Sequence, residues 1–438
     1  MAAAGLQHSR APPTAGNHHL NKLVNKIASP RGLFQIVPMQ FHFVLRLAAL
    51  AAVVFTLNLR AADSDTTAAA SPREHLSLDA GWKFHLGDDW PDALRLDKAG
   101  SSGGPSAEKF NDNSWRSLDL PHDWAIELPF DKSSDTSHGF KPVGPGFYKN
   151  SIGWYRRTFE LPAADSGKRI WLTFDGVFRD ATVWVNGWLV TRHEGGYYQF
   201  REDVTDIVRF GGKNVVTVKV DASKFEGWFY EGAGIYRHVW LDKTAPVAIA
   251  PDGIFVYTVF SNNMPTNKCD IKVHVALDKQ THDHPSLSFQ IINPDGGVVL
   301  TSKPIEGTRT NYILDSIMFG KNPETVKSWP YYFKVGELEK FLWSPENPKL
   351  YKLITTVSVD GKIIDRKETE FGIRTVGFDK DKGFLLNGQP YELKGTCNHQ
   401  DMAGVGAALP DALQYFRIAK LKEFGCNAYR TSHNPPTP

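Results

Sequence analysis

The stretch Gly425-Cys-Asn-Ala-Tyr-Arg-Thr-Ser-His-Asn-Pro-Pro-Thr-Pro438 decides the fold at the end of this chain of 438 residues. We expect it to begin as a buried strand and to continue into a polar loop that presents Arg430, Ser432, His433 and Asn434 together. In a (β/α)8 barrel, residues at the carboxyl ends of the strands carry binding and chemistry. Only about two of the eight strands fit before Pro438, so we expect the start of a barrel whose remainder lies beyond this chain.

The residues just upstream complete a βαβ unit. We expect a hairpin at Leu386-Asn-Gly388, a strand at Tyr391-Glu-Leu-Lys-Gly395 and a loop to Pro410. A helix should follow from Asp411 to Phe424, where Gly425 ends it as the C-cap residue. Strand, loop, helix and strand begin either a barrel or a doubly wound sheet.

Two β-rich segments precede this unit. Short alternating strands run from His75 to about Lys243, with a two-residue hairpin turn at Asn186-Gly187. This pattern predicts a sandwich or jelly roll. A second segment, 246–375, has turn signals about every ten residues and fits an immunoglobulin-like sandwich. We therefore expect a multidomain, mainly β protein.

Composition excludes several classes of protein. A net charge of +2 and 41% hydrophobic residues argue against disorder and against nucleic acid as a partner. The widely spaced cysteines Cys269, Cys397 and Cys426 argue against a disulfide framework or a zinc site. We expect them to be buried thiols.

The N-terminal region predicts export. The apolar stretch 47–57 follows Arg46, is too short to span a bilayer, and fits the core of a secretory signal cleaved near Ala61 or Ala62. We expect translation to begin at Met39, with 1–38 a non-structural extension, 39–62 the signal peptide and 63–74 a linker. The product would be periplasmic or extracellular, with no stable membrane span after signal removal. The alternative is a cytoplasmic tail before a membrane anchor.

Several motifs follow one another in a fixed order. They are Gly153-Trp-Tyr-Arg-Arg-Thr-Phe159, Phe174-Asp-Gly-Val177 and Val183-Trp-Val-Asn-Gly187; Gly232-Ala-Gly-Ile-Tyr-Arg-His-Val-Trp-Leu241; Leu342-Trp-Ser-Pro-Glu-Asn-Pro348 and Phe371-Gly-Ile-Arg374; and Leu386-Asn-Gly-Gln-Pro390, Lys394-Gly-Thr-Cys-Asn-His-Gln-Asp401 and Asn427-Ala-Tyr-Arg-Thr-Ser-His-Asn-Pro-Pro436. In this order they resemble glycoside hydrolase family 2, over residues 75–438.

The resemblance implies a domain order and a reaction. A sugar-binding jelly roll (75–244), an immunoglobulin-like sandwich (246–375) and the start of a (β/α)8 catalytic barrel (376–438) would follow one another. Members hydrolyse terminal β-linked sugars with retention. The sequence around Arg430 and His433 resembles that of the β-galactosidase branch most, then that of the β-glucuronidases, with the β-mannosidases third. The partner would be a carbohydrate substrate, and homo-oligomer formation by the full-length protein stays open.

The catalytic residues cannot be assigned in this chain. Retaining glycosidases need two carboxyl groups about 5–5.5 Å apart, and the family's glutamates lie on later barrel strands, beyond Pro438. Glu392, Asp401 and Glu423 do not make such a pair. We therefore expect this chain to be inactive alone. No cofactor is evident; some family members use Mg²⁺, whose ligands would also lie beyond Pro438.

The resemblance does supply part of a substrate-binding shell. His399 and His433 would contact sugar hydroxyls, and Arg430 would lie beside the nucleophile and keep it ionised. The competing readings are a loop-capping role for His399 and a structural ion pair for Arg430. Asp401 would contact sugar, position His399, or form an Asx turn.

Two further candidates and one motif complete the set. Asp221 matches an aspartate that reaches into the β-galactosidase active site, or else forms a turn before Ala222; Asn398 is a weaker candidate. His122 and Asp123 are either the rim of the site or a buried polar turn. A truncated, non-catalytic carbohydrate-binding protein and a structural two-sandwich adhesin are the other classes considered.

Overall fold

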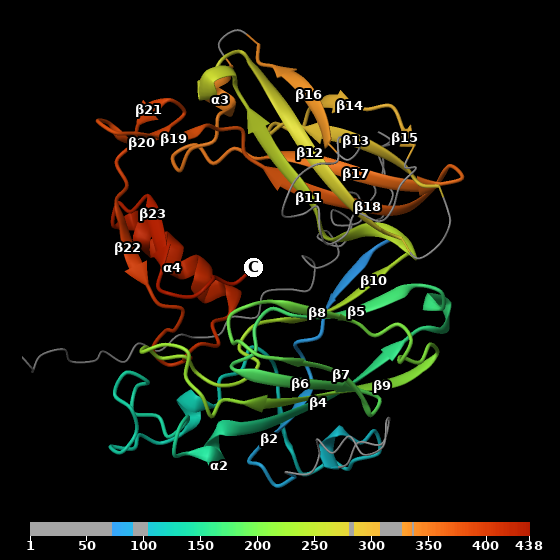
Figure 1. The fold of residues 1–438 in the computed structure, drawn as a ribbon, viewed down its shortest axis with the longest axis vertical. Coiled ribbons are helices and arrows are strands. Elements are labelled where there is room, and N and C mark those ends of the chain that lie inside the picture. Colours follow the sequence, from blue (N-terminus) through green and yellow to red (C-terminus); the bar gives the residue numbers. More distant parts are fainter. Residues whose placement is uncertain (1–71, 91–103, 280–283, 307–325, 335–336) are drawn as a thin grey trace, which may run out of the picture. The chain divides into compact units, whose positions relative to one another are not determined.

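The computed structural model describes residues 72–90, 104–279, 284–306, 326–334 and 337–438. The predicted extension 1–38, the predicted signal peptide 39–62 and most of the predicted linker 63–74 lie outside the described residues. The strands and helices form two β-domains followed by a short α/β segment (Figure 1). The chain is thus multidomain and mainly β, as predicted.

The first domain is built from two antiparallel sheets. In order across the sheet, one contains β1 (Glu74–Ser77), β10 (Val239–Thr244), β5 (Arg169–Phe174) and β8 (Phe200–Asp203). The other contains β3 (Arg116–Leu118), β2 (Trp82–Leu86), β4 (Ile152–Leu161), β9 (Gly212–Asp221), β6 (Asp180–Val185) and β7 (Trp188–His193). Short helical turns connect them: Gly104–Ser106, Ala125–Glu127, α2 (Tyr148–Ser151) and Ala163–Asp165.

Alternation along the strands explains why these segments form sheets. Val216, Val218 and Val220 of β9 are fully buried, because residues two apart in a strand point to the same face. The hairpin predicted at Asn186-Gly187 is confirmed, with both residues at positive φ between β6 and β7. Such left-handed turns match the twist of the flanking strands.

The second domain is an immunoglobulin-like sandwich. One sheet contains β11 (Val247–Val259), β12 (Lys268–Lys279) and β16 (Val326–Tyr332). The other contains β14 (Val298–Thr301), β13 (Ser286–Ile292), β17 (Tyr351–Val359) and β18 (Lys362–Phe371), with β15 (Ile305–Glu306) paired to β13. Apolar side chains from both sheets, including Ile271, Phe289 and Leu353, form one core. The short helices Ser261–Asn263 and α3 (Leu338–Phe341) lie in the connections.

The final segment is the predicted βαβ unit. A small sheet of β19 (Val376–Asp379), β20 (Gly383–Leu386) and β21 (Gln389–Pro390) leads to β22 (Gly395–Asn398), α4 (Asp411–Glu423) and β23 (Ala428–Thr431). β22 and β23 pair in parallel (Figure 1). In this register Cys397 lies opposite Arg430. The strand expected at 391–395 instead begins at Gly395.

Two other expectations concern burial. Cys269 is buried, but Cys397 is exposed and Cys426 is half-buried, so the prediction of three buried thiols is wrong. The error arises because both cysteines lie in the βαβ unit, whose strands and helix bury few side chains. Within the described ranges, none of the helices is long and apolar enough to cross a membrane.

Candidate active site

A cavity of about 610 Å³ lies at the carboxyl end of β22. Residues from the loop that follows β22 form one wall, and aromatic residues from the connection between β9 and β10 form another. Its lining is Ser137, Trp228, Phe229, Tyr230, Cys397, Asn398, His399, Asp401 and Arg417. The cavity therefore lies where parallel α/β units carry binding residues.

Two histidines meet beside this cavity. The rings of His399 and His433 are edge to face, with centroids 5.5 Å apart. Phe229 contacts both, at 5.0 Å from His399 and 5.9 Å from His433, and Trp228 lies 5.9 Å from His433. The Nδ1 atom of His399 is buried with no hydrogen-bond partner among the described residues. An imidazole pair beside aromatic faces suits contact with a sugar, whose hydroxyls bond to ring nitrogens and whose ring packs on an aromatic face.

Asp401 and Asn398 line the same cavity as His399. Asn398 Nδ2 donates to the backbone carbonyl of Thr396 at 2.9 Å, which orients its side chain at the end of β22. Arg417 of α4 donates to the backbone carbonyls of His399 at 2.8 Å and Asp401 at 2.6 Å. The guanidinium thus holds the loop that carries these candidates.

Arg430 does not line this cavity. It is exposed, and its Nη1 donates to Cys397 Sγ at 3.4 Å and to Ser432 Oγ at 3.1 Å. No carboxylate in the described part of the chain forms an ion pair with it, so the structural ion-pair reading is not supported. Its role beside a nucleophile stays a prediction.

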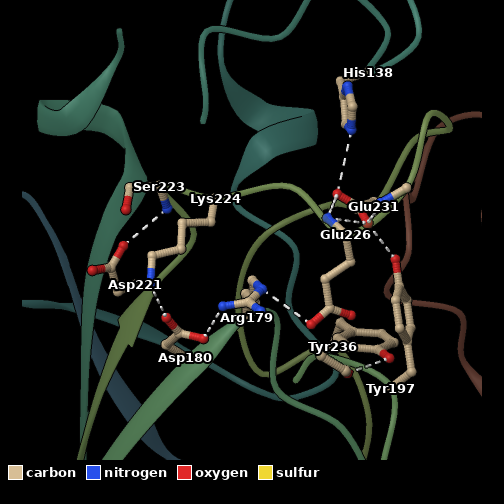
Figure 2. A network of polar contacts seen from close by, with 12 residues as sticks. His138, Arg179, Asp180, Tyr197, Asp221, Ser223, Lys224, Glu226, Glu231 and Tyr236 are labelled. Atoms are coloured by element: carbon tan, nitrogen blue, oxygen red, sulfur yellow. Dashed lines mark hydrogen bonds and ion pairs between the residues drawn. The ribbon is translucent and has the colours of Figure 1, made fainter. Parts of the chain in front are cut away.

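Asp221 lies apart from the histidines and forms a turn. Its Oδ1 accepts the backbone N–H of Ser223 at 2.9 Å, as the turn-forming reading required (Figure 2). Beside it, Asp180 pairs with Arg179 at 2.5 Å and with Lys224 at 3.5 Å. The structure therefore does not place Asp221 on the cavity lining.

The aromatic wall is held by a buried carboxylate. Glu231 is 1% exposed, and Figure 2 shows its oxygens facing Tyr197, Glu226 and His138. They accept the Tyr197 hydroxyl at 2.7 Å and the backbone N–H groups of Glu226 at 3.0 Å and Gly227 at 2.8 Å. His138 Nε2 lies 3.3 Å from Glu231 Oε2. These bonds close the loop that presents Trp228, which is 71% exposed, toward His433.

His122 and Asp123 form a buried polar turn, and neither lines the cavity. Burial lowers the pKa of His122 to about 4, and its Nδ1 shares a hydrogen bond with the Tyr155 hydroxyl at 2.7 Å. Asp123 accepts hydrogen bonds from Tyr230 and from the backbone N–H of Ala407, so it joins the jelly roll to the loop before α4. Burial raises the pKa of Asp123, against the effect of these donors.

Sequence reasoning missed the aromatic wall and Arg417. Three consecutive aromatic residues, Trp228, Phe229 and Tyr230, in a connection between strands were a usable signal, because such a run is unusual in an exposed loop. Burial raises the pKa of Tyr230, and the charges of Asp123 and Asp401 raise it further. Arg417 carried no signal beyond being a cation on the helix. Glu392 and Glu423 are exposed and pair with Lys394 and Lys420.

His238 also joins the jelly roll to α4. Its Nδ1 lies 2.7 Å from Asp79 Oδ2, and its Nε2 lies 3.1 Å from Oδ1 of Asp411, the first residue of the helix. The hydrogen bond to Asp79, with the one to Asp411, raises the pKa of His238 to about 9. Neighbouring Arg237 donates to the backbone carbonyl of Pro435 at 2.8 Å, so two successive side chains hold the βαβ unit.

This link should make stability depend on pH. Because the pKa of His238 rises from about 6.5 in the unfolded chain to about 9 in the fold, its contribution is full below about pH 6.5 and is lost as pH rises through about 9. After allowance for solvent screening, we expect a loss of about 1–2 kcal/mol. The free energy of unfolding in urea at pH 6 and pH 9.5 measures it. His238→Gln should abolish the difference, whereas the exposed control His284→Gln should keep it; equal slopes in both variants would contradict the assignment.

Models of one protein family match three consecutive parts of the chain. The sugar-binding domain of glycosyl hydrolases family 2 matches residues 77–245, the family's second domain matches 247–374, and its TIM barrel domain matches 379–438. The chain belongs to glycoside hydrolase family 2.

Individual relatives agree with this membership. The beta-galactosidase BoGH2A of Bacteroides ovatus is 33% identical over 84% of this chain and 39% of its own length. A putative beta-glucuronidase of Formosa agariphila is 32% identical over 76% of this chain and 29% of its own. The crystal structure of a beta-glycosidase from Bacteroides vulgatus superposes with a TM-score of 0.70 at 32% identity, covering 83% of this chain and 42% of that one. This member of the family spans about 40% or less of the length of these relatives.

Proposed function

We propose that this chain is the N-terminal part of an exported, retaining glycosidase that releases terminal β-linked galactose from oligo- or polysaccharides. Its family supports hydrolysis of a glycosidic bond. The predicted signal peptide supports export to the periplasm or the medium. His399, His433 and Asp401 would bind the sugar, with Trp228 providing an aromatic face for its ring.

The charges on the cavity lining favour a neutral sugar over a uronic acid. Among the described lining residues, Asp401 is the one carboxylate and Arg417 the one full cation, and Arg417 already donates to the backbone carbonyls of His399, Gln400 and Asp401. A uronic acid would bring its own carboxylate toward Asp401 without a free cation to pair with, and like charges at close range are unfavourable. A neutral sugar avoids this cost. Galactose fits better than glucuronate.

A β-glucuronidase is the second candidate. Relatives of both names match at similar identity, including the one from Formosa agariphila. A uronate-binding cation supplied by residues beyond Pro438 would favour it. The ratio of kcat/KM for nitrophenyl β-galactoside and β-glucuronide, measured on a form extended along the native reading frame, separates the two candidates.

The 438-residue chain alone should not hydrolyse nitrophenyl β-galactoside. Its cavity lining offers one carboxylate in the described residues, whereas retention needs two about 5–5.5 Å apart. We expect release of nitrophenol at the uncatalysed rate, and turnover only in the extended form. Turnover by the 438-residue chain that disappears in His433→Ala would contradict the proposal. A stop codon directly after Pro438 in the native transcript, together with galactose binding, would favour the non-catalytic carbohydrate-binding protein instead.

A further inference from the structure

A second cavity, of about 320 Å³, lies where the jelly roll meets the immunoglobulin-like domain. Its volume falls within the range of about 300–1,000 Å³ that ligand sites occupy. Charged and aromatic side chains on its lining include Arg73, His75, Trp171, Arg201, Asp242 and Lys367. None of its lining residues lines the cavity at His399.

Lys367 of β18 is a cation without an acceptor. Its ammonium forms no hydrogen bond or ion pair with any residue in the described ranges, although the side chain is half-buried. Burial lowers the pKa of Lys367, and the positive charges of Arg73 and Arg201 lower it further, whereas the negative charges of Asp252 and Asp365 raise it. A partly desolvated ammonium near two guanidinium groups is unfavourable unless a negative charge joins it.

The carboxylates around this cavity are held by other groups. Asp242 lies 2.5 Å from His75 Nδ1 and accepts the Thr173 hydroxyl at 3.0 Å. Asp278 pairs with Arg169. Asp252 is 83% exposed at its side chain and lies 3.5 Å from Arg201. None of these carboxylates forms an ion pair with the Lys367 ammonium, on which the negative charges of Asp252 and Asp365 act without direct contact.

We propose that this cavity binds the carboxylate or sulfate group of an acidic saccharide, with Lys367 as the anion partner; the Arg201 guanidinium beside it is already bonded to Thr173, Gln199 and Asp252. Lysine and arginine are the side chains that hold such oxyanions by charge-assisted hydrogen bonds. Trp171 and His75 line the same cavity and give it the aromatic surface on which sugar rings pack. The site would let the protein hold a charged polysaccharide at a point apart from the cavity at His399, and it does not depend on hydrolysis.

Titration calorimetry on the full 438-residue chain tests this site. The probes are sodium glucuronate, inorganic sulfate, sodium acetate and galactose, each at low ionic strength. Glucuronate should bind more tightly than sulfate or acetate. Lys367→Met, which keeps the apolar stem and removes the charge, should weaken glucuronate binding at least tenfold. The matched control Lys362→Met, an exposed lysine on the same strand, should change it less than twofold.

Each outcome decides the proposal. Equal binding of glucuronate by the wild type and Lys367→Met, or no binding at all, overturns it. Sulfate or acetate binding as tightly as glucuronate overturns the saccharide part, because the anion alone would then account for the affinity. Galactose binding as tightly as glucuronate overturns the anionic part. Lys367→Arg should retain binding, which keeps the test decisive if Lys367→Met fails to fold.

Discussion

Replacing Asp123 with asparagine is expected to lower the free energy of unfolding by about 3–5 kcal/mol. The side chain is buried, and each oxygen already receives two donors. Oδ1 accepts the backbone N–H groups of Ala125 at 3.0 Å and Ala233 at 2.9 Å. Oδ2 accepts that of Ala407 at 2.8 Å and the Tyr230 hydroxyl at 2.8 Å. An amide must turn its NH₂ group toward one of these pairs. Because the Tyr230 hydroxyl can rotate to accept but a backbone N–H cannot, the change leaves either the N–H of Ala407 or the N–H groups of both Ala125 and Ala233 unsatisfied.

The packing around Asp123 leaves no room for the side chain to move and recover these hydrogen bonds. A Cβ atom added at Gly232 or Gly406 would come within 2.5 or 2.2 Å of Asp123 Oδ2, so both glycines close on the carboxylate. Urea unfolding followed by circular dichroism measures the effect. Asp381→Asn is the control, because Asp381 is exposed and its ion pair with Lys380 is worth little. A loss below about 1 kcal/mol for Asp123→Asn would show that the carboxylate does not hold these donors.

Replacing Glu231 with alanine should cost about as much, about 3–5 kcal/mol, for a related reason. The change strands the Tyr197 hydroxyl and the backbone N–H groups of Glu226 and Gly227 in a buried environment. Glu231→Gln should cost only about 1–2 kcal/mol. Its amide oxygen can keep the bonds made by Oε1, and its NH₂ group can donate to His138 Nε2, which lies 3.3 Å from Oε2.

The contrast between the two sites is the sharper test. An amide is expected to be severe at Asp123 and mild at Glu231. At Asp123 each oxygen accepts a different backbone N–H, which can only donate, whereas at Glu231 the backbone N–H groups of Glu226 and Gly227 both reach Oε1. Urea midpoints of the two amide variants, measured with the wild type, give the comparison. In Glu231→Ala the loop with Trp228 should also open. A Glu231→Gln variant as unstable as Glu231→Ala would contradict this account.

Local patterns predicted the framework because they depend on neighbours in sequence. Asn186-Gly187 forms its hairpin turn, and Asp411 begins α4, since turn chemistry and helical periodicity act over a few residues. The placement of Asn398, His399 and Asp401 on one cavity also follows from local order, because Asn398 ends one strand and the other two directly follow it. The start of β22 at Gly395 could not be predicted from local order, because parallel pairing with β23, and not strand propensity, sets that boundary.

Contacts between domains could not be predicted in this way. Trp228 reaches His433 from a connection between two strands of another domain, and no periodicity in the sequence records that approach. For Asp221 the local prediction was the better one. Its side chain accepts the backbone N–H of Ser223, and it does not line the cavity that the family resemblance suggested it would reach. Cys397 and Arg430 are exposed for a similar reason, because few described residues pack on their strands.

The bond from Ala407 to Asp123 has a consequence for biosynthesis. The two residues are 284 positions apart, so the acceptor leaves the ribosome long before the donor, by roughly 15–60 s at usual rates of translation. The jelly roll can therefore be complete when the loop before α4 emerges, and the carboxylate of Asp123 can receive that loop as it appears. A barrel domain expressed without its two β-domains would have to fold this loop without the Asp123 carboxylate as its hydrogen-bond acceptor.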